Sequence, residues 1–169
     1  MIDVITIEND VLKEKSDFVS VIDESIKTLI TEMAEILEKK NGVGLAAPQI
    51  GEKKRIFITK VSGDILRVFI NPEIIQTSQE LEVYEEGCLS IPGVWANVVR
   101  PAAIIMQAWD INGKIFKIEI DGVLARVIQH EFDHLNGILF TDRLNDKQRE
   151  KVLKIYDRKN KQKSTGAVQ

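Results

Sequence analysis

Residues 122–137 read GVLARVIQHEFDHLNG, and this stretch predicts the helix around which the rest of the fold is arranged. The helix begins at about Gly122 and ends at Leu135, because the Asn-Gly pair that follows tolerates the left-handed backbone of a helix end. Residues four apart on a helix differ by about 40° in direction, so His130 and His134 leave one face a turn apart. Two imidazoles placed in this way are able to hold one metal ion.

The same segment supplies a base beside the histidines. Glu131 completes an H-E-x-x-H motif and points about 60° beyond His134, near enough to act as a general base next to the metal. The chain has only two histidines, and both lie in this motif. The alternative interpretation, two unrelated surface histidines on an ordinary helix, is therefore much less favoured.

A catalytic metal site usually has three protein ligands and one open position, so a third ligand is needed. Cys88 is the only cysteine and lies in EEGCLSIP, residues 85–92. A lone cysteine is more often a small buried apolar residue, but the need of the histidine pair favours ligation by its thiolate. A carboxylate is the alternative, as in an ordinary zinc peptidase, and its candidates are Glu85, Glu86 and Asp142. Spacing alone leaves both alternatives open.

A third notable segment reads GVGLAAPQIG, residues 42–51. Its glycines and alanines allow a second chain to approach the backbone closely. Gln49 is the only residue in it whose side chain donates a hydrogen bond. Neither phosphate-binding glycine pattern is present. The alternative is a plain connector between a helix and a strand, with small residues for packing.

The remaining periodicity predicts an α+β fold, with mixed, mainly antiparallel short strands around the central motif-bearing helix. An apolar stripe predicts an N-terminal helix over residues 20–40, with Ser20 and Asp23 as a capping signal. Strands are expected at residues 55–61, 66–71, 103–110 and 114–120, the last two forming a hairpin around an Asn-Gly turn. Three prolines, Pro72, Pro92 and Pro101, predict that the strands between them are short or at sheet edges.

Composition limits the function classes. The 169 residues carry a formal charge of −3, which suits one domain over 1–169 and disfavours a DNA-binding protein. We expect no membrane association, because no apolar run approaches the roughly 18 residues of a span. One cysteine and the lack of a visible secretory signal predict a cytoplasmic protein.

The C-terminal segment, residues 143–169, is predicted to be a basic helix followed by a frayed tail. Residues 143–163 carry a net charge of +6, so the rest of the chain carries −9. A solvated helix is the simpler interpretation, and contact with the ribosome is the more specific one.

Three segments in this order resemble the peptide deformylase family, whose motifs correspond to GVGLAAPQ, EGCLS and QHEFDH here. No motif position departs from the family pattern, and the matching region runs from about Gly42 to Gly137. The length and the N-terminal helix are similar to those of the shorter bacterial members. The resemblance implies a hydrolase that removes the formyl group from the N-terminal methionine of new polypeptides and releases formate.

The resemblance also implies a role for each motif residue. The metal ligands would be Cys88, His130 and His134, the general acid/base Glu131, and the donors to the formyl oxygen Gln49 and the backbone N–H of Leu89. The channel for the formylated peptide would be lined by Val43, Gly44 and Gly87, which pair with it as a strand does. Fe2+ is the expected metal, and Zn2+, Ni2+ or Co2+ would substitute. Ribosome contact would involve the C-terminal helix, as in some related deformylases.

Two other functions compete with this one. The first is a metallopeptidase that cleaves internal amide bonds with a carboxylate ligand, and the second is a metal-stabilised binding module for nascent peptides. Among the residues near the motifs, Asp133 is expected to form a structural ion pair. Tyr84, Trp95, Arg126 and Val127 are candidates for the methionine pocket, and a core position is the alternative for Trp95.

Overall fold

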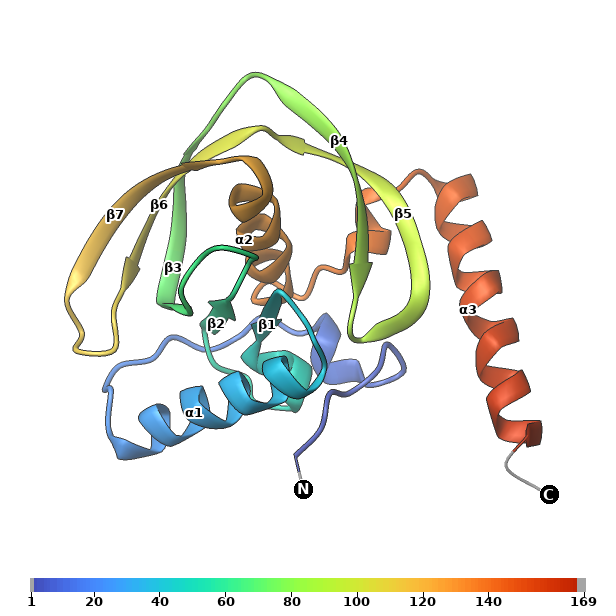
Figure 1. The fold of residues 1–169 in the computed structure, drawn as a ribbon, viewed down its shortest axis with the longest axis horizontal. Helices are drawn as coiled ribbons and strands as arrows, with labels where there is room; N and C mark the ends of the chain where they lie inside the picture. The colour runs from blue at the N-terminus through green and yellow to red at the C-terminus, as the bar shows by residue number, and fades with distance from the viewer. Residues whose placement is uncertain (1, 167–169) are drawn as a thin grey trace.

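The computed structural model describes residues 2–166 and shows an α+β fold (Figure 1). The three α-helices are α1 (Glu24–Lys39), α2 (Gly122–His134) and α3 (Asp146–Gly166). The strands are β1 (Gly44–Ala46), β2 (Ile56–Thr59), β3 (Arg67–Thr77), β4 (Leu81–Cys88), β5 (Ile91–Pro101), β6 (Ala103–Trp109) and β7 (Ile115–Asp121). The short 3-10 helices are η1 (Asp10–Lys13), η2 (Ala47–Ile50) and η3 (Phe140–Arg143).

The strands form two sheets that flank helix α2. One sheet has five strands in the order β1-β2-β3-β6-β7, and the other is the β4–β5 hairpin. Every pairing between these named strands is antiparallel. Figure 1 shows α2 at the centre, with the five-stranded sheet on one side and β4–β5 arching over the other. The predicted fold class is confirmed.

Helix α2 is anchored by its apolar face. Ala125, Ile128 and Leu135 are fully buried and pack with Phe57 and Phe69 of the five-stranded sheet. The two histidines of the motif leave the helix on another face and reach the space under β4. The predicted helix is therefore confirmed, with Leu135 as its C-terminal cap.

Helix α1 matches its predicted apolar stripe but begins later than expected. Its N-cap is Asp23, whose carboxylate accepts a hydrogen bond from the backbone N–H of Ile26 at 3.1 Å. The predicted start near Ser20 is wrong, because the side chain that satisfies a free N–H of the first turn lies three residues later. The buried stripe of α1 packs against β1 and β2.

The β6–β7 hairpin is confirmed, and Gly113 takes the left-handed conformation with φ 77° in its turn. The expectation of short or edge strands around the prolines is wrong for β3. That strand has 11 residues and continues through Pro72 in the interior of the sheet. Its pairing with β6 shifts between Ile70 and Glu73, and this irregularity accommodates a residue that has no N–H to donate.

The basic C-terminal segment is confirmed as a helix to Gly166, and the end of the predicted tail, 167–169, lies outside the described residues. Helix α3 packs against β5, where Val152 and Tyr156 are buried. A fully solvated helix is therefore the wrong interpretation, because one face belongs to the core. Over residues 2–166, none of the helices has the length and apolar character needed to span a bilayer.

Candidate metal centre

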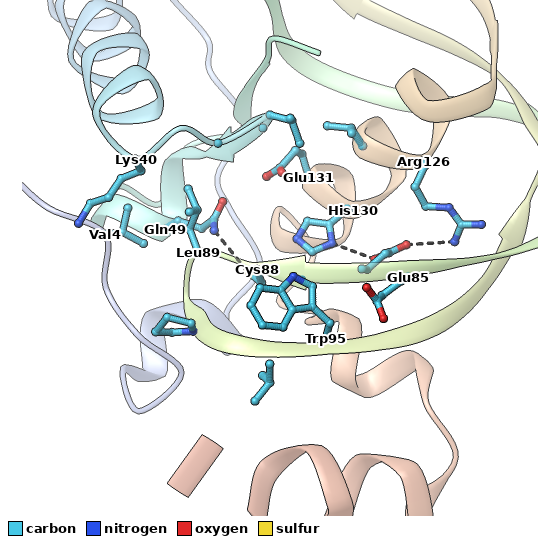
Figure 2. Close-up of a pocket in the computed structure, with 18 of the residues that line it drawn as sticks. Val4, Lys40, Gln49, Glu85, Cys88, Leu89, Trp95, Arg126, His130 and Glu131 are labelled. Atoms are coloured by element: carbon cyan, nitrogen blue, oxygen red, sulfur yellow. Dashed lines mark hydrogen bonds and ion pairs between the residues drawn. The ribbon is translucent and has the colours of Figure 1, made fainter. Parts of the chain in front are cut away.

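Three side chains from two elements converge below the β4–β5 hairpin. His130 and His134 project from one face of α2 with ring centroids 5.1 Å apart, and Cys88 ends β4. Figure 2 shows His130 and Cys88 in the same site. One potential ligand atom from each of these residues lies within 4.8 Å of the other two. The Cys88 Sγ and the Nε2 of His134 are 3.3 Å apart. The spacing of His130 and His134 on α2 explains why their rings are close together, and the β4–β5 hairpin places the Cys88 thiol beside them.

Among residues 2–166, the cluster of side chains that could hold an ion includes none of the carboxylates considered as third ligand. Glu85 is exposed, and Asp142 is exposed and paired with Arg149. Glu86 is buried but contacts the ring of His130, with its Oε2 2.9 Å from Nδ1. An ionised carboxylate only accepts hydrogen bonds, so the His130 Nδ1 donates, and Nε2 is the ring atom that would bind a metal. The arrangement supports Cys88 as the third ligand.

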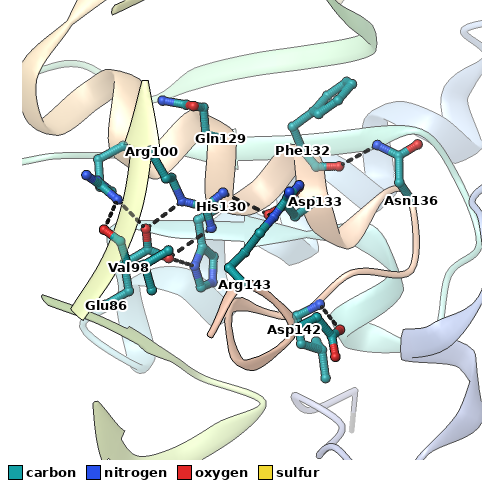
Figure 3. A network of polar contacts seen from close by, with 12 residues as sticks. Glu86, Val98, Arg100, Gln129, His130, Phe132, Asp133, Asn136, Asp142 and Arg143 are labelled. Atoms are coloured by element: carbon teal, nitrogen blue, oxygen red, sulfur yellow. Dashed lines mark hydrogen bonds and ion pairs between the residues drawn. The ribbon is translucent and has the colours of Figure 1, made fainter. Parts of the chain in front are cut away.

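Glu86 belongs to a buried network of charges that joins the hairpin to α2 (Figure 3). Its carboxylate accepts from Arg100 Nε at 2.6 Å and from Arg126 Nη1 at 3.0 Å. Burial alone would raise the pKa of Glu86, but the hydrogen bonds from His130 and Arg100 hold this pKa well below its usual range. Arg100 also donates to Asp133 of α2 at 2.8 Å. Glu86 is therefore an anion that orients His130.

Asp133 occupies the other end of this network. Its carboxylate binds Arg100 and also accepts from Arg143 of η3, at 2.6 Å from Nη2 and 3.0 Å from Nε. These contacts agree with the structural ion pair expected from the sequence. Sequence reasoning did not find the part played by Arg100 and Arg143. Neither belongs to a motif, and only their place in the fold brings them to Asp133.

Glu131 is 3% exposed and lies beside the proposed ligands (Figure 2). Burial raises its pKa to about 7, and its Oε2 has no hydrogen-bond partner within residues 2–166. A buried carboxyl group without a partner is costly unless its site is used by a ligand or a reactant. Gly44 of β1 packs directly against it, and a Cβ at that position would collide with the Glu131 carboxylate.

Gln49 is held in η2 with its amide directed toward Cys88. Its Oε1 accepts from the backbone N–H of Ala46 at 2.9 Å, which fixes the orientation of the amide. Its Nε2 lies 3.2 Å from Ser90 Oγ and 3.6 Å from Cys88 Sγ. The two amide hydrogens therefore point toward the Cys88 thiol and the Ser90 hydroxyl, and Leu89, which lies between these residues in the sequence, lines the same cavity.

A cavity of about 730 Å³ is lined by Gln49, Cys88, His130 and Glu131 and opens to the surface. The cavity is lined by the residues expected to form the peptide channel, Val43, Gly44 and Gly87. It is also lined by the candidates for the methionine pocket, Tyr84, Trp95, Arg126 and Val127. Val43 is 49% exposed at its rim, whereas Gly44 is buried. A core position for Trp95 is wrong, because this side chain is 59% exposed.

The residues present fit one divalent metal ion. A thiol and two imidazoles form a donor set suited to first-row transition metals. Burial lowers the pKa of His134 well below its ordinary value, which keeps this imidazole in the neutral form that binds a metal. The partnerless oxygen of Glu131 lies next to them.

Comparison with known proteins agrees with this geometry. A family model for polypeptide deformylases matches residues 1–150. A peptide deformylase of Treponema pallidum is 48% identical over 141 residues, which covers 83% of this chain and 86% of that protein. A peptide deformylase of Borreliella burgdorferi is 47% identical over 152 residues, covering 89% of this chain and 92% of that protein.

Solved structures agree as well. The crystal structure of a peptide deformylase from Legionella pneumophila superimposes with a TM-score of 0.91 and 35% identity, covering 97% of this chain and 98% of that one. This chain therefore belongs to the peptide deformylase family.

Proposed function

We propose a role for each residue of the site in the activity of this family. The enzyme is a metal-dependent hydrolase that removes the N-formyl group from newly made polypeptides. The expected reaction takes the group from the N-terminal methionine and releases formate. The observation that carries the proposal is the convergence of Cys88, His130 and His134 beside a buried glutamate. The whole chain, 1–169, acts as one catalytic domain.

Cys88, His130 and His134 hold the metal, which is Fe2+ in the cell. The same donor set also suits Zn2+, Ni2+ and Co2+, so these ions substitute for it. When bound, a divalent ion supplies a Lewis acid that polarises a carbonyl and lowers the pKa of water. Glu86 keeps the ring of His130 in the tautomer and orientation that ligation requires, because its carboxylate accepts from Nδ1.

Glu131 is the general acid/base. It accepts a proton from the attacking water and later gives this proton to the amine that leaves with the peptide. A pKa of about 7, raised by burial, suits a group that must both accept and return a proton near neutral pH. Gly44 keeps the backbone of β1 against this carboxyl group, and a side chain at residue 44 would displace it.

Gln49 and the backbone N–H of Leu89 stabilise the formyl oxygen as it gains negative charge. The Gln49 amide is fixed by Ala46 and is therefore oriented before the substrate arrives. Removing one donor of this kind typically costs about 10²–10³ in rate.

The peptide binds along β1. This strand is at the edge of its sheet and pairs only with β2 among the named strands, so its other edge is available to an extended chain. Val43 and Gly44 line the cavity, and Gly87 of β4 lines it as well. A formylated peptide between them would place its first residue next to Glu131.

The test of this function is formate release by the metal-loaded enzyme. We expect it to deformylate formyl-Met-Ala and to leave acetyl-Met-Ala and the internal bonds of longer peptides intact. A metallopeptidase would instead cleave internal bonds, and a binding module would retain the peptide unchanged. Either result would overturn the proposal.

We also propose that the enzyme acts in the cytoplasm and contacts the ribosome through α3. The support is the net charge of +6 over residues 143–163 and the exposure of Lys147, Lys151 and Lys154. Deleting the helix would remove core residues, so the test replaces these three lysines by glutamate. Co-sedimentation with ribosomes over a salt series should weaken strongly in this variant, and unchanged binding would contradict the contact.

A further inference from the structure

The outer wall of the cavity contains an exposed indole whose position is set by its neighbours. Trp95 of β5 is paired in register with Gly87 of β4, one residue before Cys88. A Cβ at residue 87 would lie 2.5 Å from the Trp95 Nε1. The indole therefore lies across the backbone of Gly87, and it can do so only because that residue lacks a side chain. Figure 2 shows the ring beside Cys88.

A residue of the C-terminal helix also contacts this wall. Lys159 of α3 places its ammonium group 5.9 Å from the centroid of the Trp95 ring and donates a hydrogen bond to the carbonyl oxygen of Gly93. One lysine thus lies near the indole ring and binds the backbone of β5 two residues before Trp95. Helix α3 packs against β5 through Val152 and Tyr156. The backbone that carries Lys159 is therefore held in place relative to Trp95.

The cavity has room for more than the reacting residue. Its volume of about 730 Å³ exceeds what a formyl group and one methionine fill, and its rim is lined by Tyr84 and Trp95, 56% and 59% exposed. An exposed indole offers a flat apolar surface on which another planar side chain stacks favourably.

We propose that Trp95, positioned by Lys159, binds the side chain of a residue that follows the formylmethionine and makes this enzyme favour an aromatic residue there. The inference rests on the proposed deformylation and adds a specificity determinant to it. Trp95 contacts the substrate, whereas Lys159 is a positioning residue that acts through the indole and the β5 backbone at Gly93. The C-terminal helix thereby contributes to substrate choice without reaching the metal.

The test compares kcat/KM for formyl-Met-Ala-Ala, formyl-Met-Phe-Ala and formyl-Met-Ala-Phe. The kcat/KM of the wild type should be higher for at least one of the two phenylalanine peptides than for formyl-Met-Ala-Ala, by about threefold or more. This difference should come from a lower KM rather than from a higher kcat. Trp95→Ala should bring this ratio close to one. If Trp95→Ala keeps the ratio of the wild type, the indole is not the determinant.

The role of Lys159 is tested by Lys159→Met, which keeps the length of the side chain but removes its charge and hydrogen bonds. We expect this variant to lose a large part of the preference and Lys159→Arg to recover it. The matched control is Lys154→Met, at an exposed position of the same helix where the lysine pairs with Glu150. Equal ratios in Lys159→Met and Lys154→Met would overturn the positioning role. No deformylation of any peptide by the wild type would instead refute the proposed function.

Discussion

Helix α2 and the β4–β5 hairpin bring their ligands to the metal site by different physical means. In α2, the one-turn spacing of His130 and His134 follows from backbone hydrogen bonds within the helix. In the hairpin, Cys88 lies next to a register shift after Gly87, and its strand is tied to α2 by the Glu86 network of buried charges. Local geometry therefore sets one half of the site, and contacts distant in sequence set the other.

Because of this difference, the residue proposed for proton transfer and the residue that orients a metal ligand lie in different elements. The residue proposed to carry the proton, Glu131, lies on the helix, where its direction relative to the histidines is fixed. The residue that orients a ligand, Glu86, lies on the hairpin. Substitutions in the two halves should therefore affect different quantities.

The largest effect is expected from Glu131→Gln in the helix. This variant keeps the shape of the side chain but removes its ability to carry the proton, so kcat should fall by about 10²–10⁴ while the metal content stays unchanged. Formate release and elemental analysis of the same preparation measure both. Glu119→Gln, exposed on β7, is the matched control. Unchanged turnover in Glu131→Gln would remove this residue from the mechanism.

A smaller effect of another kind is expected from Glu86→Gln in the hairpin. Loss of the anion that accepts from His130 should weaken metal affinity about 10–100-fold. Competition with a chelator measures this affinity, and circular dichroism confirms that the variant is folded. Glu82→Gln is the control, because Glu82 is exposed on the same strand. Equal affinities in the two variants would show that α2 alone positions its histidines.

The smallest effect concerns how the hairpin is held. Val98 and Val99 are adjacent on β5, but the first is 1% exposed and the second 54%. Val98→Ala should lower the free energy of unfolding by roughly 2 kcal/mol, because it removes buried methyl groups. Val99→Ala should change it by no more than about 0.5 kcal/mol. Urea denaturation of both variants measures the difference, and equal losses would mean that the two faces of the hairpin are not distinct.

The same division explains which features could be predicted from the sequence. The periodicity of α1 and α2 and the Asn-Gly turn of the β6–β7 hairpin are local signals, and each predicted its element. The histidine pair and Glu131 follow from spacing on one helix. The thiol of Cys88 was favoured only because the pair required a third ligand.

The features that sequence reasoning missed depend on distant neighbours. The long strand β3 continues through Pro72 because its partner β6 shifts register there, which no local pattern indicates. The arginines around Glu86 come from β5 and α2, and Arg143 comes from η3. The exposure of Trp95 depends on Gly87 across the hairpin. The start of α1 is the exception, since Asp23 belongs to the capping signal in the sequence and only the expected boundary at residue 20 is too early.

The central claim is that one cysteine of the hairpin and two histidines of the helix hold a single ion on which deformylation depends. It is tested most directly by measuring metal content and formate release from formyl-Met-Ala for anaerobically purified wild type and for Cys88→Ala. We predict about one ion per chain and activity in the wild type, with both lost in the variant. A folded Cys88→Ala protein that keeps its metal and its rate would contradict the account.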